Sequence, residues 1–191
     1  MAAMLVLAGL LLTATITDVR ERKVYNWTTY PGIALALIAN AAATAWGLDL
    51  QSPVNDRLGF VGVPDSLAGC LGIGFIMMAC FVFFPGGVGG GDVKLLAMIG
   101  AFLGPWRGLE ALLWTFVLGA CMAIVILVWR IGAPGLLAWA FWRVVGLVRH
   151  RAWMPMPSED RERWQTDVFL SPAALAAVAI VQLSYSGGAL Y

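Results

Sequence analysis

Charged residues are scarce in this 191-residue chain. Only 12% of its residues are Asp, Glu, Lys or Arg, and 61% are hydrophobic, whereas a soluble domain carries about 25% charged residues. This deficit excludes an ordinary soluble domain and indicates a polytopic membrane protein. The net charge is +1, which provides no bulk attraction for nucleic acid, so we expect no nucleic-acid partner.

Cysteine and histidine are also too few for the common metal sites. The three cysteines, Cys70, Cys80 and Cys121, all lie in apolar runs and form no CxxC pair, so neither a zinc ribbon nor a redox motif is expected. The single histidine, His150, lies among arginines and has no obvious catalytic partner. We therefore expect no metal and no cofactor, and no Ser/His/Asp set is apparent.

Long apolar runs dominate what is present. Membranes are spanned by helix bundles or closed barrels, and these runs have helical lengths without sheet-like alternation. We therefore predict an all-α fold, a polytopic membrane helix bundle of about six transmembrane helices, in a single membrane-embedded domain over residues 1–191. The first run is expected to be a retained helix rather than a signal peptide, because its basic residues follow it. The six runs are roughly 2–17, 28–47, 66–85, 93–104, 109–129 and 169–190.

A seventh segment, 133–148, is short and carries Arg143 in its middle. We expect it to be an amphipathic helix lying in the cytosolic interface. With the N-terminus outside, ten of the twelve Lys and Arg residues fall on the cytosolic side, and only Arg57 and Arg107 fall outside. If 133–148 spanned the membrane, this asymmetry would fall to roughly six against six.

The predicted topology places two aspartates on the cytosolic side of the membrane. Asp18 ends the first helix, and Asp92 opens the fourth, which Pro105 and Trp106 stop. The run from Asp92 to Gly104 rises about 20 Å, less than a hydrocarbon thickness of about 30 Å. Asp92 is therefore expected within the cytosolic leaflet, where a carboxylate is costly and marks a functional site by default.

Five of the six residues before Asp92, over 86–91, are glycines. Glycine has no Cβ, so its backbone can approach another chain closely. The run fits either a loose turn between helices or a loop that receives an extended peptide. Nucleotide-binding loops do not fit, because Asp92 stands where a Walker loop needs lysine and where a dinucleotide fingerprint needs its last glycine.

Two neighbouring carboxylates offer chemistry without a metal. One of them holds a proton near neutrality, so the ionised group can activate water while the protonated group polarises a peptide carbonyl. Asp18 taken singly also fits a solvated helix end. A different class stays open as well: in a small transporter or channel-like protein, Asp18 and Asp92 would bind protons or cations.

The segment GVGGGDVKLLAMIGAFLG resembles the signature of the type IV prepilin peptidases, the GxGD membrane aspartic proteases. Gly89, Gly91 and Asp92 match GxGD, and Lys94 matches the usual extension of that motif. Lys94 is expected to orient the loop, to balance charge or simply to extend toward the interface.

The segment TDVRERKVYNW resembles the first-aspartate segment of the same family. Asp18 and Asn26 match, whereas Tyr25 stands where the family usually has proline. Asn26 is expected to hydrogen-bond near Asp18 or to cap a helix. The resemblance covers roughly residues 1–130, and the C-terminal third is less typical.

The resemblance implies an aspartic endopeptidase of the bacterial inner membrane, with catalytic Asp18 and Asp92 facing the cytosol. Its substrate would be a type IV prepilin or pseudopilin, cleaved after a short basic leader. The chain has none of the paired CxxC motifs of the larger members and resembles the short, peptidase-only form of Flp (tight-adherence) pilus systems. Membrane lipid and pilus-assembly components are the other implied partners, and an inactive pilus-assembly scaffold is the alternative within the family.

Overall fold

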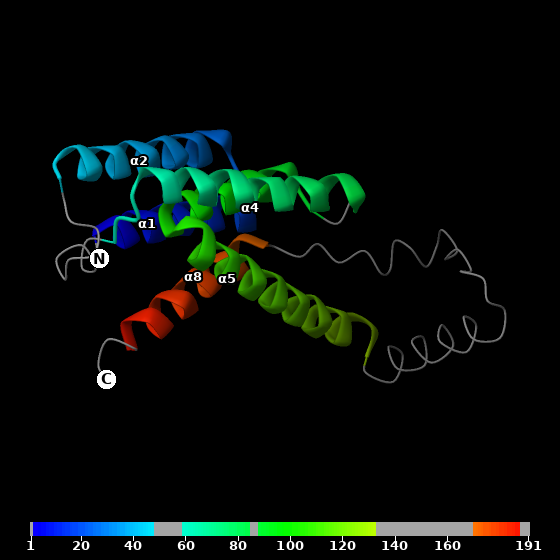
Figure 1. Cartoon of the computed structure of the whole chain (residues 1–191). Helices are drawn as coiled ribbons and strands as arrows, with labels where there is room; N and C mark the ends of the chain where they lie inside the picture. The colour runs from blue at the N-terminus through cyan, green and yellow to red at the C-terminus, as the bar shows by residue number, and fades with distance from the viewer. Residues whose placement is uncertain (1, 48–58, 85–87, 133–169, 188–191) are drawn as a thin grey trace, which may run out of the picture. The chain divides into compact units, whose positions relative to one another are not determined.

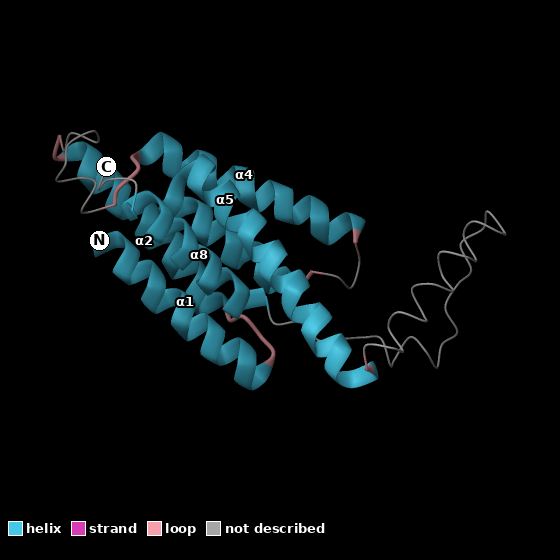
Figure 2. Ribbon diagram, turned by 90° about the horizontal axis from the view of Figure 1, so that it is seen from below, coloured by secondary structure: helices cyan, strands magenta, loops and turns pink. Residues whose placement is uncertain are grey.

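The structure is a computed structural model that describes residues 2–47, 59–84, 88–132 and 170–187. Every regular element in these ranges is an α-helix (Figures 1 and 2), which confirms the predicted all-α fold. The predicted helix at 133–148 lies outside the described residues. The helices are α1 (Ala2–Glu21), α2 (Asn26–Ala45), α4 (Val63–Phe83), α5 (Gly90–Ile131) and α8 (Leu170–Gly187).

Three of the described helices are long and apolar enough to cross a membrane. The qualifying stretches are Ala3–Glu21 of α1, Val63–Phe83 of α4 and Gly90–Trp129 of α5, while Leu170–Tyr185 of α8 is a shorter apolar stretch. This composition and these lengths suit a membrane helix bundle. The count of six spans stays a prediction.

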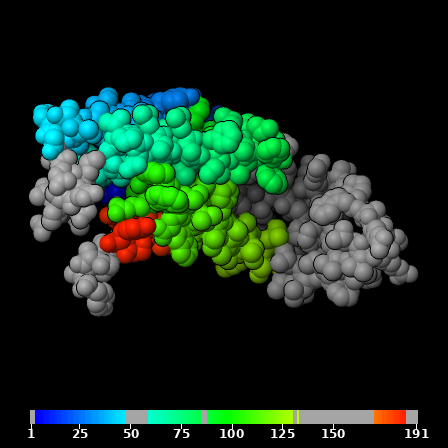
Figure 3. All heavy atoms as spheres, viewed as in Figure 1, coloured from blue at the N-terminus to red at the C-terminus, as the bar shows by residue number. Residues whose placement is uncertain are grey.

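The chain divides into two compact units, and the first, Met1–Leu118 with Phe169–Tyr191, holds all the features discussed below. In the second unit the structure describes only the last part of α5 and Gly132. Within the first unit, α1 packs against both α2 and α8, and α2 packs against α4 (Figure 1). Figure 3 shows α2 and α4 side by side on one face of this unit.

The first part of α5 lies at the centre of this unit. Every residue from Leu95 to Gly104 is buried. These residues are apolar on every side of the helix rather than along one stripe. A helix of this composition needs neighbours on every side, which is typical of a core helix. The first turn of this enclosed helix carries Asp92.

Glycines bring α4 and α5 into backbone contact. A Cβ added at Gly69 would lie 2.1 Å from the carbonyl oxygen of Gly100, and one added at Gly100 would lie 2.3 Å from that of Gly69. The buried hydroxyl of Ser66 donates to the carbonyl of Ala101 at 2.7 Å. Small residues allow such close approach between membrane helices, and the contact holds the axis of α5 in place.

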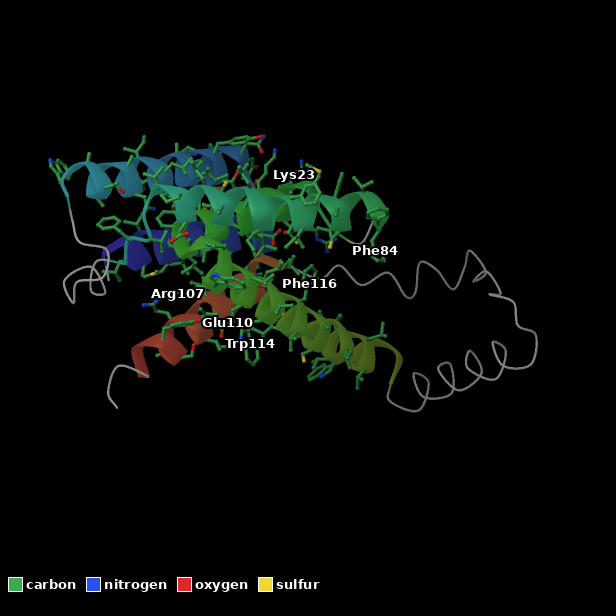
Figure 4. The ribbon with its side chains drawn as sticks, viewed as in Figure 1. Lys23, Phe84, Arg107, Glu110, Trp114 and Phe116 are labelled. Atoms are coloured by element: carbon green, nitrogen blue, oxygen red, sulfur yellow. The ribbon has the colours of Figure 1, made fainter. Side chains whose placement is uncertain are left out.

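The helix α5 breaks at Gly104, whose φ of 77° and ψ of −177° are not helical, and Pro105 follows. Positive φ favours glycine, and proline cannot donate to the preceding turn. The runs predicted at 93–104 and 109–129 are the two sides of this break. Beyond it, the guanidinium of Arg107 lies 4.4 Å from the ring centre of Tyr185 and ties α5 to α8 (Figure 4 labels Arg107).

Candidate active site

The two motifs singled out in the sequence line a single pocket of about 390 Å³. One wall is the end of α1 with its connection to α2, where Figure 4 labels Lys23, and the other is the glycine turn at the start of α5. The pocket therefore brings Asp18 and Asp92 to one site. The lining residues are Asp18, Arg22, Lys23, Val24, Tyr25, Asn26, Gly89, Gly90, Gly91 and Asp92.

Asp92 is held by the backbone of its own turn. The N–H of Gly89 donates to Oδ2 of Asp92 at 3.1 Å, and the N–H of Asp92 donates to the carbonyl of Gly89 at 3.0 Å. Because α5 begins at Gly90, Gly89 is the residue before the helix and Asp92 is its third residue. The side-chain bond is the half of a capping box in which the third helical residue accepts from the N–H of the N-cap residue, and the other bond is an ordinary backbone turn. A helix start also favours negative charge.

Asp18 is held by another helix. It lies one turn before the end of α1, which continues to Glu21, beyond the predicted end of the run. Its side chain is only 8% exposed, and its Oδ2 accepts a hydrogen bond from the buried hydroxyl of Ser171 at the start of α8. The helix then ends at Arg22, which has a φ of 54° and donates its N–H to the carbonyl of Asp18 at 2.8 Å.

Asp18 and Asp92 line the same pocket. Two carboxylates in one partly enclosed pocket cannot both ionise cheaply, so such a pair tends to share a proton. Chemically, the arrangement can hold a water between an ionised and a protonated carboxyl group.

A second contact joins the two motifs. The Nζ of Lys94 donates to Oδ1 of Asn26 at 2.7 Å and lies 4.9 Å from the ring centre of Tyr30. Asn26 is the first residue of α2, and no side chain caps that helix. Asn26 therefore pairs with Lys94 instead of capping α2, and the pair connects the first turn of α2 to the first turn of α5.

The three glycines of the turn differ in how much room surrounds them. A Cβ at Gly91 would lie 2.8 Å from the Cβ of Val24, and one at Gly89 would lie 3.0 Å from Oδ2 of Asp92, whereas one at Gly90 would meet no atom within 4 Å. The first and third glycines therefore have physical reasons to lack a side chain. Gly91 in particular sets how closely α5 approaches the connection after α1.

Tyr25, where the sequence departs from the family pattern, has a proline-like backbone. Its φ of −78° lies within the range that a proline ring imposes. Its hydroxyl donates to the Glu21 carboxylate, and this hydrogen bond and the charge of Glu21 raise the pKa of Tyr25. The exposed hydroxyl therefore stays protonated near neutrality, and the pocket keeps its backbone shape without proline.

Sequence reasoning missed Ser171. A serine followed by proline is an ordinary signal for a helix start, and nothing local to Ser171 indicates that its hydroxyl contacts a helix far away in the chain. Across the described ranges, no three His, Cys, Asp or Glu side chains gather in a way that could hold a metal ion.

A family model described as the type IV leader peptidase family matches residues 5–124. The matched range covers more than half of the chain and includes both Asp18 and Asp92, while Ser171 lies outside it. Comparisons with curated proteins and with solved structures gave no match.

Proposed function

Because the chain belongs to the type IV leader peptidase family, we propose that it is an aspartic endopeptidase that removes the short basic leader of type IV prepilins or pseudopilins. Family membership makes it a peptidase, and its apolar helices make it a membrane protein. The observation that carries the finer proposal is the single pocket shared by Asp18 and Asp92, which come from different helices.

In the proposed reaction, Asp18 and Asp92 share one proton and hold a water between them. The ionised carboxylate takes a proton from this water as its oxygen attacks the scissile carbonyl carbon. The protonated carboxyl group polarises the carbonyl oxygen. The resulting diol then collapses, the C–N bond breaks, and the leaving amine takes up a proton from the pair. Every step uses the two carboxyl groups and water, so no cofactor enters.

The glycine turn is the proposed binding surface for the substrate backbone. Gly89 and Gly90 are both exposed, and the space where Gly90 would carry a Cβ is open. An extended peptide could therefore lie against this turn with its carbonyl groups near Asp92. Lys94 and Asn26 are proposed to keep the turn and the first-aspartate segment in register through their hydrogen bond.

We also propose that the pocket opens on the cytosolic side of the bacterial inner membrane. Basic residues gather where α1 ends, at Arg20, Arg22 and Lys23, and Lys and Arg are enriched in cytosolic connections. The substrate's apolar helix would then stay in the bilayer while its basic leader remains in the cytosol.

The test is cleavage of a co-expressed prepilin from the same genome, followed by the change in gel mobility when the leader is lost. Asp18→Asn and Asp92→Asn should each lower cleavage by roughly a thousandfold or more, because residues that act as a unit fail together. Asp65→Asn is the matched control, since Asp65 is exposed and also lies in the first turn of a helix. It should cleave like the wild type.

Membrane levels of each variant are measured by immunoblot so that loss of activity is separated from loss of protein. Cleavage that survives both Asp18→Asn and Asp92→Asn would overturn the dyad and favour the scaffold or the transporter, with another peptidase of the cell removing the leader. A wild type that cleaves none of the prepilins and pseudopilins of its genome would favour the inactive scaffold.

A further inference from the structure

The hydrogen bond between Ser171 and Asp18 links the beginning and the end of the described chain. Ser171 is the second residue of α8, its side chain is fully buried, and its hydroxyl donates to Oδ2 of Asp18. The two residues are 153 positions apart. By contrast, the hydroxyls of Thr13, Thr15 and Thr17 in α1 all donate to carbonyls of their own helix.

The hydrogen bond engages one of the two carboxylate oxygens of Asp18. A hydroxyl that donates to a carboxylate oxygen fixes the rotamer of that side chain. Oδ2 is engaged by Ser171 of α8, and the water of the proposed reaction would contact Oδ1. Asp92 has the same arrangement, since its Oδ2 is engaged by the N–H of Gly89.

The helix that carries Ser171 is itself held in place. α8 packs along α1, and near its far end the ring of Tyr185 lies against the guanidinium of Arg107. The position of the Ser171 hydroxyl therefore depends on how α8 packs against α1 and on its contact with Arg107 of α5.

We propose that Ser171 is a positioning residue for the peptidase reaction, which orients Asp18 so that Oδ1 faces the water and thereby makes α8 part of the active site. The inference rests on the proposed function, because it assumes that Asp18 acts on the substrate. It assigns a role to a residue beyond the range that the family model matches.

The decisive variants are Ser171→Thr and Ser171→Val, which have the same shape and differ only in the hydroxyl. Any packing cost of the added methyl group is common to both, so their difference reports the hydrogen bond. Ser171→Ala removes the hydroxyl without adding bulk. Ser184→Ala is the matched control, because Ser184 lies on the same helix and donates only to its own Val181 carbonyl.

The measurement is steady-state cleavage of a prepilin substrate by purified full-length protein in detergent, normalised to the folded fraction. A lost hydrogen bond to a charged group should lower kcat by about tenfold to a hundredfold. We expect this loss in Ser171→Val relative to Ser171→Thr and in Ser171→Ala relative to the wild type. KM should stay within about twofold, because the substrate-binding turn is untouched, and Ser184→Ala should match the wild type.

Equal kcat values for Ser171→Thr and Ser171→Val would overturn the proposal, as would a Ser171→Ala variant that cleaves like the wild type. A rise in KM with unchanged kcat would also overturn it, since that pattern belongs to substrate binding. Asp18→Asn is assayed in parallel. If it stays active the proposed dyad fails, whereas an inactive Asp18→Asn with an active Ser171→Val removes only the role of Ser171.

Discussion

The two carboxylates of the pocket are held in opposite ways. Asp92 is held by Gly89, three residues before it, within a turn that forms its hydrogen bonds locally. Asp18 is held by Ser171 across 153 residues, through a helix that packs along α1. One half of the site is therefore encoded in a short stretch of sequence, whereas the other half exists only once the bundle has assembled.

Disturbing the glycine turn that carries Asp92 should lower cleavage more than removing the hydrogen bond between Lys94 and Asn26. In Gly91→Ala the added Cβ would lie 2.8 Å from the Cβ of Val24, so the turn must shift and carry Asp92 with it. Forced overpacking costs about 1–3 kcal/mol, so we expect cleavage to fall about tenfold or more. Gly90→Ala is the matched control, because its Cβ meets open space, and it should retain most of its activity.

A double variant tests the cause of this loss. Val24→Gly removes the atom that the new Cβ of Gly91→Ala would meet, so the combination should recover part of the lost cleavage. If Gly91→Ala and Gly90→Ala cleave equally well, the close approach to Val24 does not position Asp92.

Removing the hydrogen bond between Lys94 and Asn26 should have a smaller effect. Lys94→Met and Asn26→Ala each remove the hydrogen bond between the first turns of α5 and α2. The pair is exposed, so screening by water weakens it, and we expect each variant to lose about threefold in kcat. The double variant should be little worse than either single one, because both changes remove the same interaction.

This prediction is wrong if the losses in kcat of Lys94→Met and Asn26→Ala multiply in the double variant. In that outcome each side chain acts separately, and the two halves of the pocket are held in register by other contacts, such as that of Gly91 with Val24.

The smallest effect on cleavage is expected at Tyr25, in the connection between α1 and α2. Tyr25→Pro introduces the residue that the family usually has there, and the φ of −78° already suits it. We expect cleavage within about twofold of the wild type and a gain in stability of about 0.4–1 kcal/mol, from reduced freedom of the unfolded chain. Thermal unfolding of the purified protein measures the gain.

Tyr25→Phe distinguishes the effect of losing the Tyr25 hydroxyl from the effect of restricting the backbone. It removes the hydrogen bond to Glu21 but keeps the same backbone freedom, so it should show no gain in stability. A large loss of cleavage in Tyr25→Phe would mean that the Tyr25 hydroxyl contributes directly at the pocket.

The sequence predicted those parts of the molecule that depend on neighbouring residues. The all-α fold followed from apolar runs, the break in α5 followed from Gly104 and Pro105, and the turn before Asp92 followed from its glycines. Asp18 and Asp92 line one pocket, which agrees with the expectation that they lie on the same side, while the topology behind that expectation stays a prediction. Each of these predictions relied on local composition or on the membrane, which restricts a chain to few arrangements.

The contacts that the sequence did not predict are those made between distant segments. Neither Ser171 nor Val24 had an expected role, and Asn26 was expected to hydrogen-bond near Asp18 or to cap a helix. The partners of these side chains are fixed by how α1, α2, α5 and α8 pack, and no local pattern carries that information. The segment 133–148 stays a prediction, since it lies outside the described residues.

The enclosure of the first part of α5 has a consequence for how the protein responds to its bilayer. Lipid thickness acts on helices through their lipid-facing surfaces, which tilt or shift when the lengths do not match. The stretch from Leu95 to Gly104 is buried in protein, and α4 holds it by backbone contact at Gly69 and Gly100. The position of Asp92 relative to the helices around it is thus set by contacts within the protein, so we expect it to respond little to a change in bilayer thickness.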